Sequence, residues 1–128
     1  MTIKIAFPDN YCDDASLVEP LPTEIQDLSE YKDAHLKYED LRKGTRRIPI
    51  PPAELVAYAN FRPADLVALV NKNPTAKFIR VFNGVRPSGI YTHFMFMVAV
   101  DSNENVIDTM VIENCCQCPP RCKDKGGF

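Results

Sequence analysis

The feature that most constrains the fold is an unbroken run of seven apolar residues from Phe94 to Val100. A strand with water on one face alternates polar and apolar side chains, because successive side chains point to opposite faces. This run does not alternate, so it predicts a strand that is covered on both faces. The two predicted faces are Phe94, Phe96, Val98 and Val100 on one side, and Met95, Met97 and Ala99 on the other.

Two neighbouring segments predict strands on either side of this run. Residues 77–85 precede it and residues 106–113 follow it, and both are rich in apolar residues. Turn-forming residues at 86–89 and 102–105 separate the three strands. Because connections this short favour antiparallel neighbours, the three strands predict a β-meander. Residues 2–7 alternate and add a short, half-buried strand.

Capping and proline signals predict three helices. The longest runs from Thr23, a good N-cap with Gln26 as its capping-box partner, to Gly44, a suitable C-terminal stop. Two shorter helices, at about residues 52–60 and 63–71, each begin at a proline, which suits the first helical turn. The predicted fold class is therefore α+β: a three-to-four-stranded, mainly antiparallel sheet with a C-terminal meander, packed against about three helices.

The chain length of 128 residues predicts a single domain, 1–128, with a Cys-rich segment at 115–122 and a loose tail at 123–128. Helices gathered on one face of the sheet would leave the other apolar face bare. A homodimer through that sheet face is then expected, because a second copy supplies the missing cover. If the long helix instead covers the second face, the chain is expected to be monomeric.

Charge and hydropathy exclude several kinds of partner. The net charge is −2, from 15 basic and 17 acidic residues, so we expect no nucleic acid and no membrane as partner. No segment approaches the roughly 20 apolar residues that a membrane-spanning helix needs. The N-terminal residues lack the apolar region of a secretory signal, so the expected location is cytoplasmic. The sequence does not identify a protein or small-molecule partner.

The strongest chemical signal is a cysteine cluster, Cys115, Cys116, Cys118 and Cys122, which holds four of the five cysteines within eight residues. Zinc binds four thiolate or imidazole ligands in a tetrahedron. The zinc hypothesis uses Cys118 and Cys122 with one of the adjacent pair, because adjacent residues do not easily share one ion. The fourth ligand would be Cys12 or a histidine.

Two other interpretations of the cluster remain open. One is a thiol–disulfide pair, either Cys115–Cys118 or Cys118–Cys122, in a loop that the prolines stiffen. The other is structural, with buried thiols and a proline-braced turn that fasten the end of the last strand. Possible zinc is the only cofactor that the sequence suggests.

A second candidate site lies at one end of the predicted sheet, at Arg80, Asn83, Arg86, Tyr91 and His93. The two arginines can bind a carboxylate or phosphate, and the histidine can move a proton. Alternatively, the histidine forms hydrogen bonds at the sheet edge, and the arginines cover the surface with their aliphatic stems. This alternative is the more common arrangement.

These features predict a non-enzymatic binding or regulatory module. The sequence has no glycine-rich phosphate loop, no G-x-S-x-G and no H-E-x-x-H, and its only histidines are His35 and His93. His35 lies beside an apolar helical stripe and is expected to be a packing residue. The alternative function is a small-ligand-binding protein or enzyme that uses the pocket near His93. A closed pocket with convergent polar groups favours the alternative, and a flat apolar face favours the module.

Overall fold

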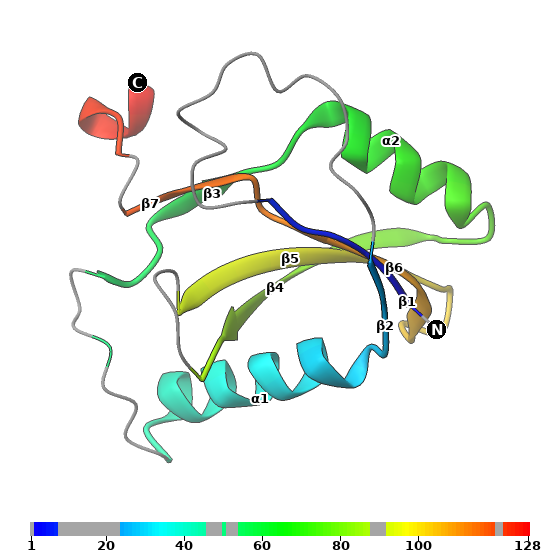
Figure 1. Ribbon diagram of the computed structural model, residues 1–128, viewed down its shortest axis with the longest axis horizontal. Helices are drawn as coiled ribbons and strands as arrows, with labels where there is room; N and C mark the ends of the chain where they lie inside the picture. The colour runs from blue at the N-terminus through cyan, green and yellow to red at the C-terminus, as the bar shows by residue number, and fades with distance from the viewer. Residues whose placement is uncertain (1, 8–23, 46–49, 51–53, 88–91, 120–121) are drawn as a thin grey trace.

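The computed structural model shows an α+β fold with two α-helices on opposite sides of one sheet (Figure 1). The structure describes residues 2–7, 24–45, 50, 54–87, 92–119 and 122–128. Its elements, in chain order, are β1 (Thr2–Ile5), β2 (Glu24–Gln26), α1 (Ser29–Lys43), β3 (Tyr58–Asn60), α2 (Pro63–Lys72), β4 (Phe78–Val85), β5 (His93–Val100), β6 (Val106–Glu113), β7 (Cys116–Cys118) and the 3₁₀-helix η3 (Asp124–Gly127).

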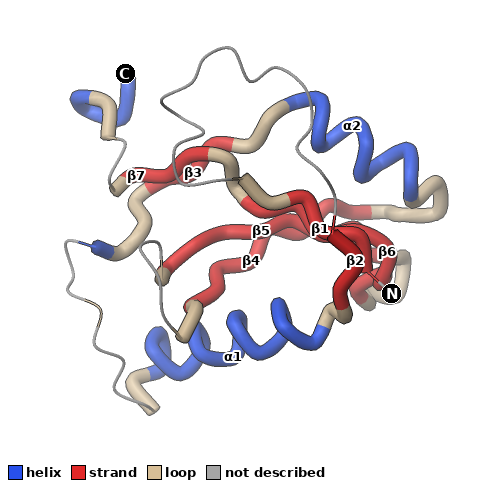
Figure 2. Tube along the Cα trace, viewed as in Figure 1, coloured by secondary structure: helices blue, strands red, loops and turns tan. Residues whose placement is uncertain are grey.

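The strands form two sheets, which Figure 2 shows in red. The main sheet has five strands in the order β2-β1-β6-β5-β4, and the small sheet pairs β3 with β7. The predicted meander is confirmed, because β4, β5 and β6 are antiparallel neighbours. The main sheet is mixed, however, because β1 runs parallel to β6. It also has five strands, rather than the three to four predicted, because β2 adds an edge beside β1.

β5 is buried on both faces, as its unbroken apolar run predicts. Phe96 and Val98 belong to a cluster that includes Tyr31 of α1. Met97 faces the other way and belongs to a second cluster with Leu69 of α2. The alternation matches the prediction, with Phe94, Phe96, Val98 and Val100 in the first cluster and Met97 and Ala99 in the second.

The two helices give the sheet two covered faces. Figure 1 shows α1 on one side of the main sheet and α2 on the other. The apolar residues of β5 other than Met95 are each no more than 3% exposed. In the described part of the chain, β5 therefore offers no bare face to a second copy. The physical reason for predicting a homodimer through this sheet does not apply, and association in solution stays a prediction.

The predicted start of the first helix is wrong, and its predicted end is confirmed. Glu24–Gln26 form β2, and the helix begins only at Ser29. The capping-box signal at Thr23 is local, whereas Ile25 pairs with Ile3 of β1, far away in the sequence. Gly44 ends the helix in the left-handed region, at φ 69°, where glycine has no Cβ penalty.

The predicted helix at 52–60 is also wrong. Within this range residues 52 and 53 lie outside the description, and Tyr58–Asn60 form β3. Their backbone partners belong to β7, because Tyr58 lies opposite Cys118 in an antiparallel register. The predicted helix at 63–71 is confirmed as α2, with Pro63 in its first turn. The described residues thus contain two α-helices rather than about three, and neither is long and apolar enough to cross a membrane.

Candidate functional site

The structure brings together only two residues of the predicted pocket. Asn83 of β4 and His93 of β5 are in hydrogen-bond contact, with 3.0 Å between Asn83 Oδ1 and His93 Nε2. Arg80 lies near the surface, where its Nη1 donates to the backbone oxygen of Glu104 at 3.3 Å. Arg86 forms contacts on the α1 side of the sheet, and Tyr91 lies outside the described residues.

Asn83 and His93 line a cavity of about 690 Å³ at the end of the sheet, which we call the His93 cavity. In Figure 1 this end of β5 lies between the C-terminal end of α1 and the small sheet. The volume is typical of small-molecule sites, which span about 300–1,000 Å³. The lining consists of Tyr38, Leu41 and Arg42 of α1, the segment from Leu55 to Ala59, Asn83 of β4, and His93 and Met95 of β5.

His93 is held as a neutral imidazole. The backbone N–H of Val56 donates to His93 Nδ1 at 2.9 Å, so this nitrogen carries no proton. The proton therefore resides on Nε2, which donates to Asn83 Oδ1. Burial lowers the pKa of His93, because desolvation disfavours the charged form. Both ring nitrogens are thus occupied by hydrogen bonds within the chain.

Neighbouring elements fix His93 from several directions. The ring of Tyr38 stacks on the imidazole, with 5.3 Å between centroids and 15° between planes. Gln117 of β7 donates through Nε2 to the backbone oxygen of His93 at 2.8 Å. His93 therefore links α1, the main sheet and the small sheet. A ligand would meet a preformed surface here, because the ring cannot turn without breaking these contacts.

Two hydrogen-bonding groups beside the cavity have no partner among the described residues. Asn83 accepts a hydrogen bond through Oδ1, but its side-chain NH₂ has no hydrogen-bond partner within the described residues. The hydroxyl of Tyr38 likewise has none in that part of the chain. The Arg42 guanidinium is instead paired, with 2.6 Å between its Nη2 and Glu39 Oε2. The cavity thus combines apolar walls with two neutral polar groups.

Arg86 belongs to a buried network on the other side of the sheet. Its Nη2 donates to Glu113 Oε2 at 2.7 Å, and its guanidinium lies 3.8 Å from the ring centroid of Phe94. The Tyr31 hydroxyl donates to the other carboxylate oxygen of Glu113 at 2.9 Å. Burial and the neighbouring Glu113 raise the pKa of Tyr31, so it remains a donor. The charge of Arg86 is therefore satisfied within the chain, beside a separate cavity of about 240 Å³.

His35 is a packing residue, as expected from its position on the helix. Its Nδ1 lies 2.8 Å from the backbone oxygen of Asn83, and its ring centroid lies 4.5 Å from the ring centroid of Phe82. Glu39 is also close, with 3.4 Å between its Oε1 and His35 Nε2. These contacts attach α1 to β4 and hold Tyr38, one turn further along, above His93.

Three of the four described cysteines are disulfide-bonded, and the described residues show no metal site. Cys118 and Cys122 are joined, with Cα atoms 4.7 Å apart, and Cys116 is disulfide-bonded as well. Cys115 is a thiol, and burial raises its pKa. Zinc needs thiolate ligands, and within the described residues no group of three or more His, Cys, Asp or Glu can hold an ion. Cys12 lies outside those residues, so zinc stays a prediction for the reduced chain.

Among the described residues that line the His93 cavity, sequence reasoning assigned only Asn83 and His93; Tyr38, Val56 and Tyr58 are among those that it missed. Tyr38 follows Tyr31 by two helical turns, so the sequence predicts that it lies on the packed side of α1. The sequence does not predict that it contacts His93. Val56 and Tyr58 lie in a segment that was predicted to be helical. No local signal identifies them, because their positions depend on pairing with β7.

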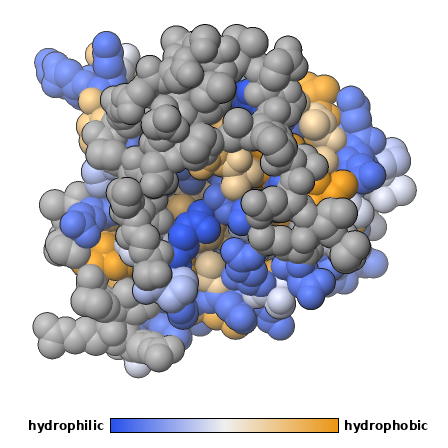
Figure 3. Space-filling view, in the orientation of Figure 1, coloured by the Kyte–Doolittle hydropathy of each residue, from blue (hydrophilic) through white to orange (hydrophobic). Residues whose placement is uncertain are grey.

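Comparison with known proteins does not identify a ligand. On the face seen in Figure 3, apolar and hydrophilic side chains of the described residues are interspersed. We base the assignment of a function on the residues of the His93 cavity. No family model matches this chain, and no curated protein or solved structure matches it.

Proposed function

We propose that this protein is a non-enzymatic binding module that holds a small organic molecule in the His93 cavity. The observation that carries the proposal is the cavity itself: about 690 Å³, mostly apolar, with the side-chain NH₂ of Asn83 and the hydroxyl of Tyr38 unpaired within the described residues. Small-molecule sites have this composition, because apolar walls supply affinity and a few polar groups fix orientation.

The charges around the cavity favour an uncharged ligand. Arg42 is the cationic residue among the described residues of the lining, and its guanidinium is bound to Glu39 through Nε and Nη2. The hydrogen bond from Arg42 lowers the pKa of Glu39, so the pair stays ionised at neutral pH. An anionic ligand would have to displace this carboxylate. A neutral molecule with a carbonyl-type acceptor instead meets the N–H groups of Asn83 directly.

The hydrogen bonds of His93 favour binding over catalysis. A general base needs a ring nitrogen within reach of the substrate proton. Nδ1 of His93 accepts from Val56 and Nε2 donates to Asn83, so neither nitrogen is available to a substrate. The imidazole serves instead to hold the Asn83 amide in one orientation, with its NH₂ end turned away from the histidine.

Nile red, a neutral dye with a carbonyl oxygen, is a suitable probe. We expect saturable, one-to-one binding, measured by dye fluorescence. Leu41 lines the cavity, and Leu41→Trp should weaken binding at least about tenfold by filling it. The matched control is Leu36→Trp on the same helix, because Leu36 is 49% exposed and outside the lining. Absence of saturable binding, or equal effects of the two variants, would contradict the proposal.

A further inference from the structure

We propose that the Cys118–Cys122 disulfide is a redox switch for ligand binding. In the oxidised protein it holds the segment from Leu55 to Ala59, which we call the cavity wall, and its reduction releases that wall. This inference rests on the proposed function, because it concerns the same cavity. The disulfide itself does not line the cavity.

The cavity wall is attached to the strand that carries the disulfide. The backbone N–H of Ala57 donates to the oxygen of Cys118 at 2.7 Å. In the small sheet, Tyr58 lies opposite Cys118 and Ala59 lies opposite Gln117. Three consecutive residues of the wall thus take their positions from β7. A displacement of β7 therefore changes the shape of the cavity.

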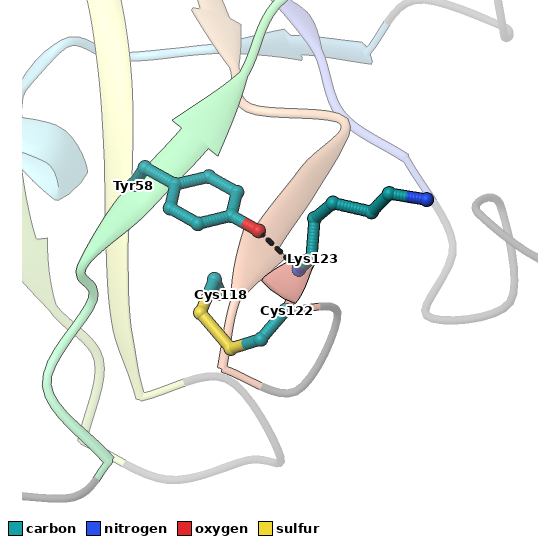
Figure 4. Close-up of a disulfide and its surroundings, with 4 residues drawn as sticks. All are labelled: Tyr58, Cys118, Cys122 and Lys123. Atoms are coloured by element: carbon teal, nitrogen blue, oxygen red, sulfur yellow. Dashed lines mark hydrogen bonds between the residues drawn. A yellow bond between two sulfur atoms is a disulfide. The ribbon is translucent and has the colours of Figure 1, made fainter. Parts of the chain in front are cut away.

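The disulfide holds Tyr58 from two sides, as Figure 4 shows. Cys118 pairs with the backbone of Tyr58, and the backbone N–H of Lys123 donates to the Tyr58 hydroxyl at 2.6 Å. Lys123 directly follows Cys122, so the covalent bond fixes the donor above the tyrosine. Without the disulfide, the Lys123 N–H is connected to Cys118 only through the intervening residues of the chain.

The small sheet is short, and its inner end is also held by the disulfide of Cys116 and by the backbone N–H of Cys115, which donates to the Asn60 oxygen at 2.9 Å. β3 and β7 contain three residues each, and a two-stranded ribbon is marginal in water without further support. Its contact with the main sheet includes the Gln117 side chain on the backbone of His93. Loss of the disulfide should therefore loosen the outer end of β7, at Cys118, while Gln117 remains attached.

The disulfide is placed for thiol–disulfide exchange with a dithiol reductant. Cys122 is exposed, whereas Cys118 is only 6% exposed. A thiolate of the reductant attacks Cys122 Sγ, forming a mixed disulfide, and Cys118 leaves as a thiolate that takes up a proton. The second thiol of the reductant then displaces Cys122 and closes its own disulfide. Two electrons and two protons pass from the dithiol to the protein.

The test compares Nile red binding by oxidised native protein and by a variant carrying Cys118→Ser and Cys122→Ser. Serine variants are needed because Cys116 is also disulfide-bonded, so a dithiol acts on more than one bond. If the released wall is in place about a tenth of the time, binding weakens about tenfold. The matched control is Cys115→Ser, which removes the neighbouring thiol and should leave affinity within about twofold of native.

Amide hydrogen exchange supplies a readout that needs no ligand. In the double-serine variant the Ala57 amide should exchange faster, while the Val98 amide in the main sheet stays protected. If native protein binds no Nile red, the proposed function fails, and exchange at Ala57 still tests the switch. If native protein binds and the double variant binds equally well with unchanged exchange, the switch is wrong and the binding function stands.

A second variant keeps the inference testable if the double variant does not fold. Lys123→Pro retains the disulfide but removes the N–H that donates to Tyr58. Proline requires only a modest backbone adjustment there, because the φ of Lys123 is −89° and proline prefers about −65°. We expect binding about threefold weaker, the size of one neutral hydrogen bond. Unchanged affinity in this folded variant would overturn the claim that Lys123 and the disulfide hold the wall.

Discussion

The main sheet and the small sheet are stabilised by different interactions. In the main sheet β5 pairs with β4 along all eight residues, and Val98 and Val111 are fully buried between the helices. Burial of this kind contributes about 25 cal/mol per Å² of apolar surface. In the small sheet β3 and β7 pair over three residues, and the Cys118–Cys122 disulfide closes its outer end.

This difference explains why the candidate site lies where the two sheets meet. Asn83 and His93 belong to the main sheet, which holds them in fixed positions. The opposite wall, including Val56, is attached to the less extensive small sheet. Binding regions are commonly drawn from the less stable parts of a fold, because they have to open and close. One rigid side and one releasable side suit a ligand-binding cavity.

The largest expected effect comes from removing a buried ring of the main sheet. Phe96 is 3% exposed and its ring lies 5.2 Å from that of Tyr31. Phe96→Ala should lower the free energy of unfolding by about 3–5 kcal/mol, measured by denaturant titration with circular dichroism. Phe78→Ala is the matched control, because Phe78 is 47% exposed, and it should cost under about 1 kcal/mol. Similar losses of unfolding free energy in the two variants would contradict the claim that the buried rings stabilise the main sheet.

The second largest effect should come from the buried ion pair under α1. Glu113→Ala leaves Arg86 without its carboxylate and Tyr31 without its acceptor. We expect the free energy of unfolding to fall by about 2–3 kcal/mol, because a partly buried charge loses its partner. Nile red affinity should not change, since Glu113 does not line the His93 cavity. A large loss of binding by the folded variant would show that the two sides of the sheet are coupled.

Removing the disulfide should have a smaller effect on global stability. Cys118 and Cys122 are four residues apart, so their bond closes a short loop. Because short loops lose little entropy on closure, Cys118→Ser with Cys122→Ser should cost about 2 kcal/mol or less. The far-UV circular dichroism spectrum should remain that of the native fold. Complete unfolding of this variant would mean that the main sheet depends on the small one.

His93 should give a still smaller, pH-dependent effect. Its folded pKa is below the ordinary value, so the unfolded chain takes up a proton first as pH falls through about 6.5. Stability is therefore retained above that pH and lost below it, by at most about 1.4 kcal/mol per pH unit. Urea midpoints at pH 7.5 and 5.5 should differ more for native protein than for His93→Gln. If the urea midpoints of the two proteins change equally between these pH values, a group other than His93 is responsible for the pH dependence.

Chelator should have the smallest effect of all. Disulfide sulfurs are not thiolates, so oxidised protein should show the same melting temperature with and without chelator. The predicted zinc binding requires reduction first, and elemental analysis of reduced protein measures it. Metal found in the oxidised protein would show that residues outside the cysteine cluster supply the ligands.

Much of the main sheet was predictable, because its signals are local and periodic. The apolar run at 94–100 predicts both faces of β5, and Pro63 and Gly44 mark helix ends correctly. β2, β3 and β7 were missed, because three residues carry too little periodicity. Their pairing depends on partners that lie far away in the sequence.

The candidate site was only partly predictable. Asn83 and His93 meet because the meander sets their register, with Asn83 opposite Met95 and Val85 opposite His93. Arg86 lies three residues from Asn83, so the two-residue period of a strand sends it to the other face. Tyr38 and Val56 depend on how α1 and the small sheet dock. Such docking is set by tertiary packing rather than by any local pattern.

The parallel pairing of β1 with β6 has a consequence for the order of folding. Ile3 lies beside Met110, and Thr2 donates to the side chain of Asp108, so this contact joins opposite ends of the sequence. During synthesis β1 leaves the ribosome long before its partner exists. The meander has short connections and can form first, because closing a long loop costs more entropy. Docking of the N-terminal strand onto β6 is therefore expected only after translation of β6.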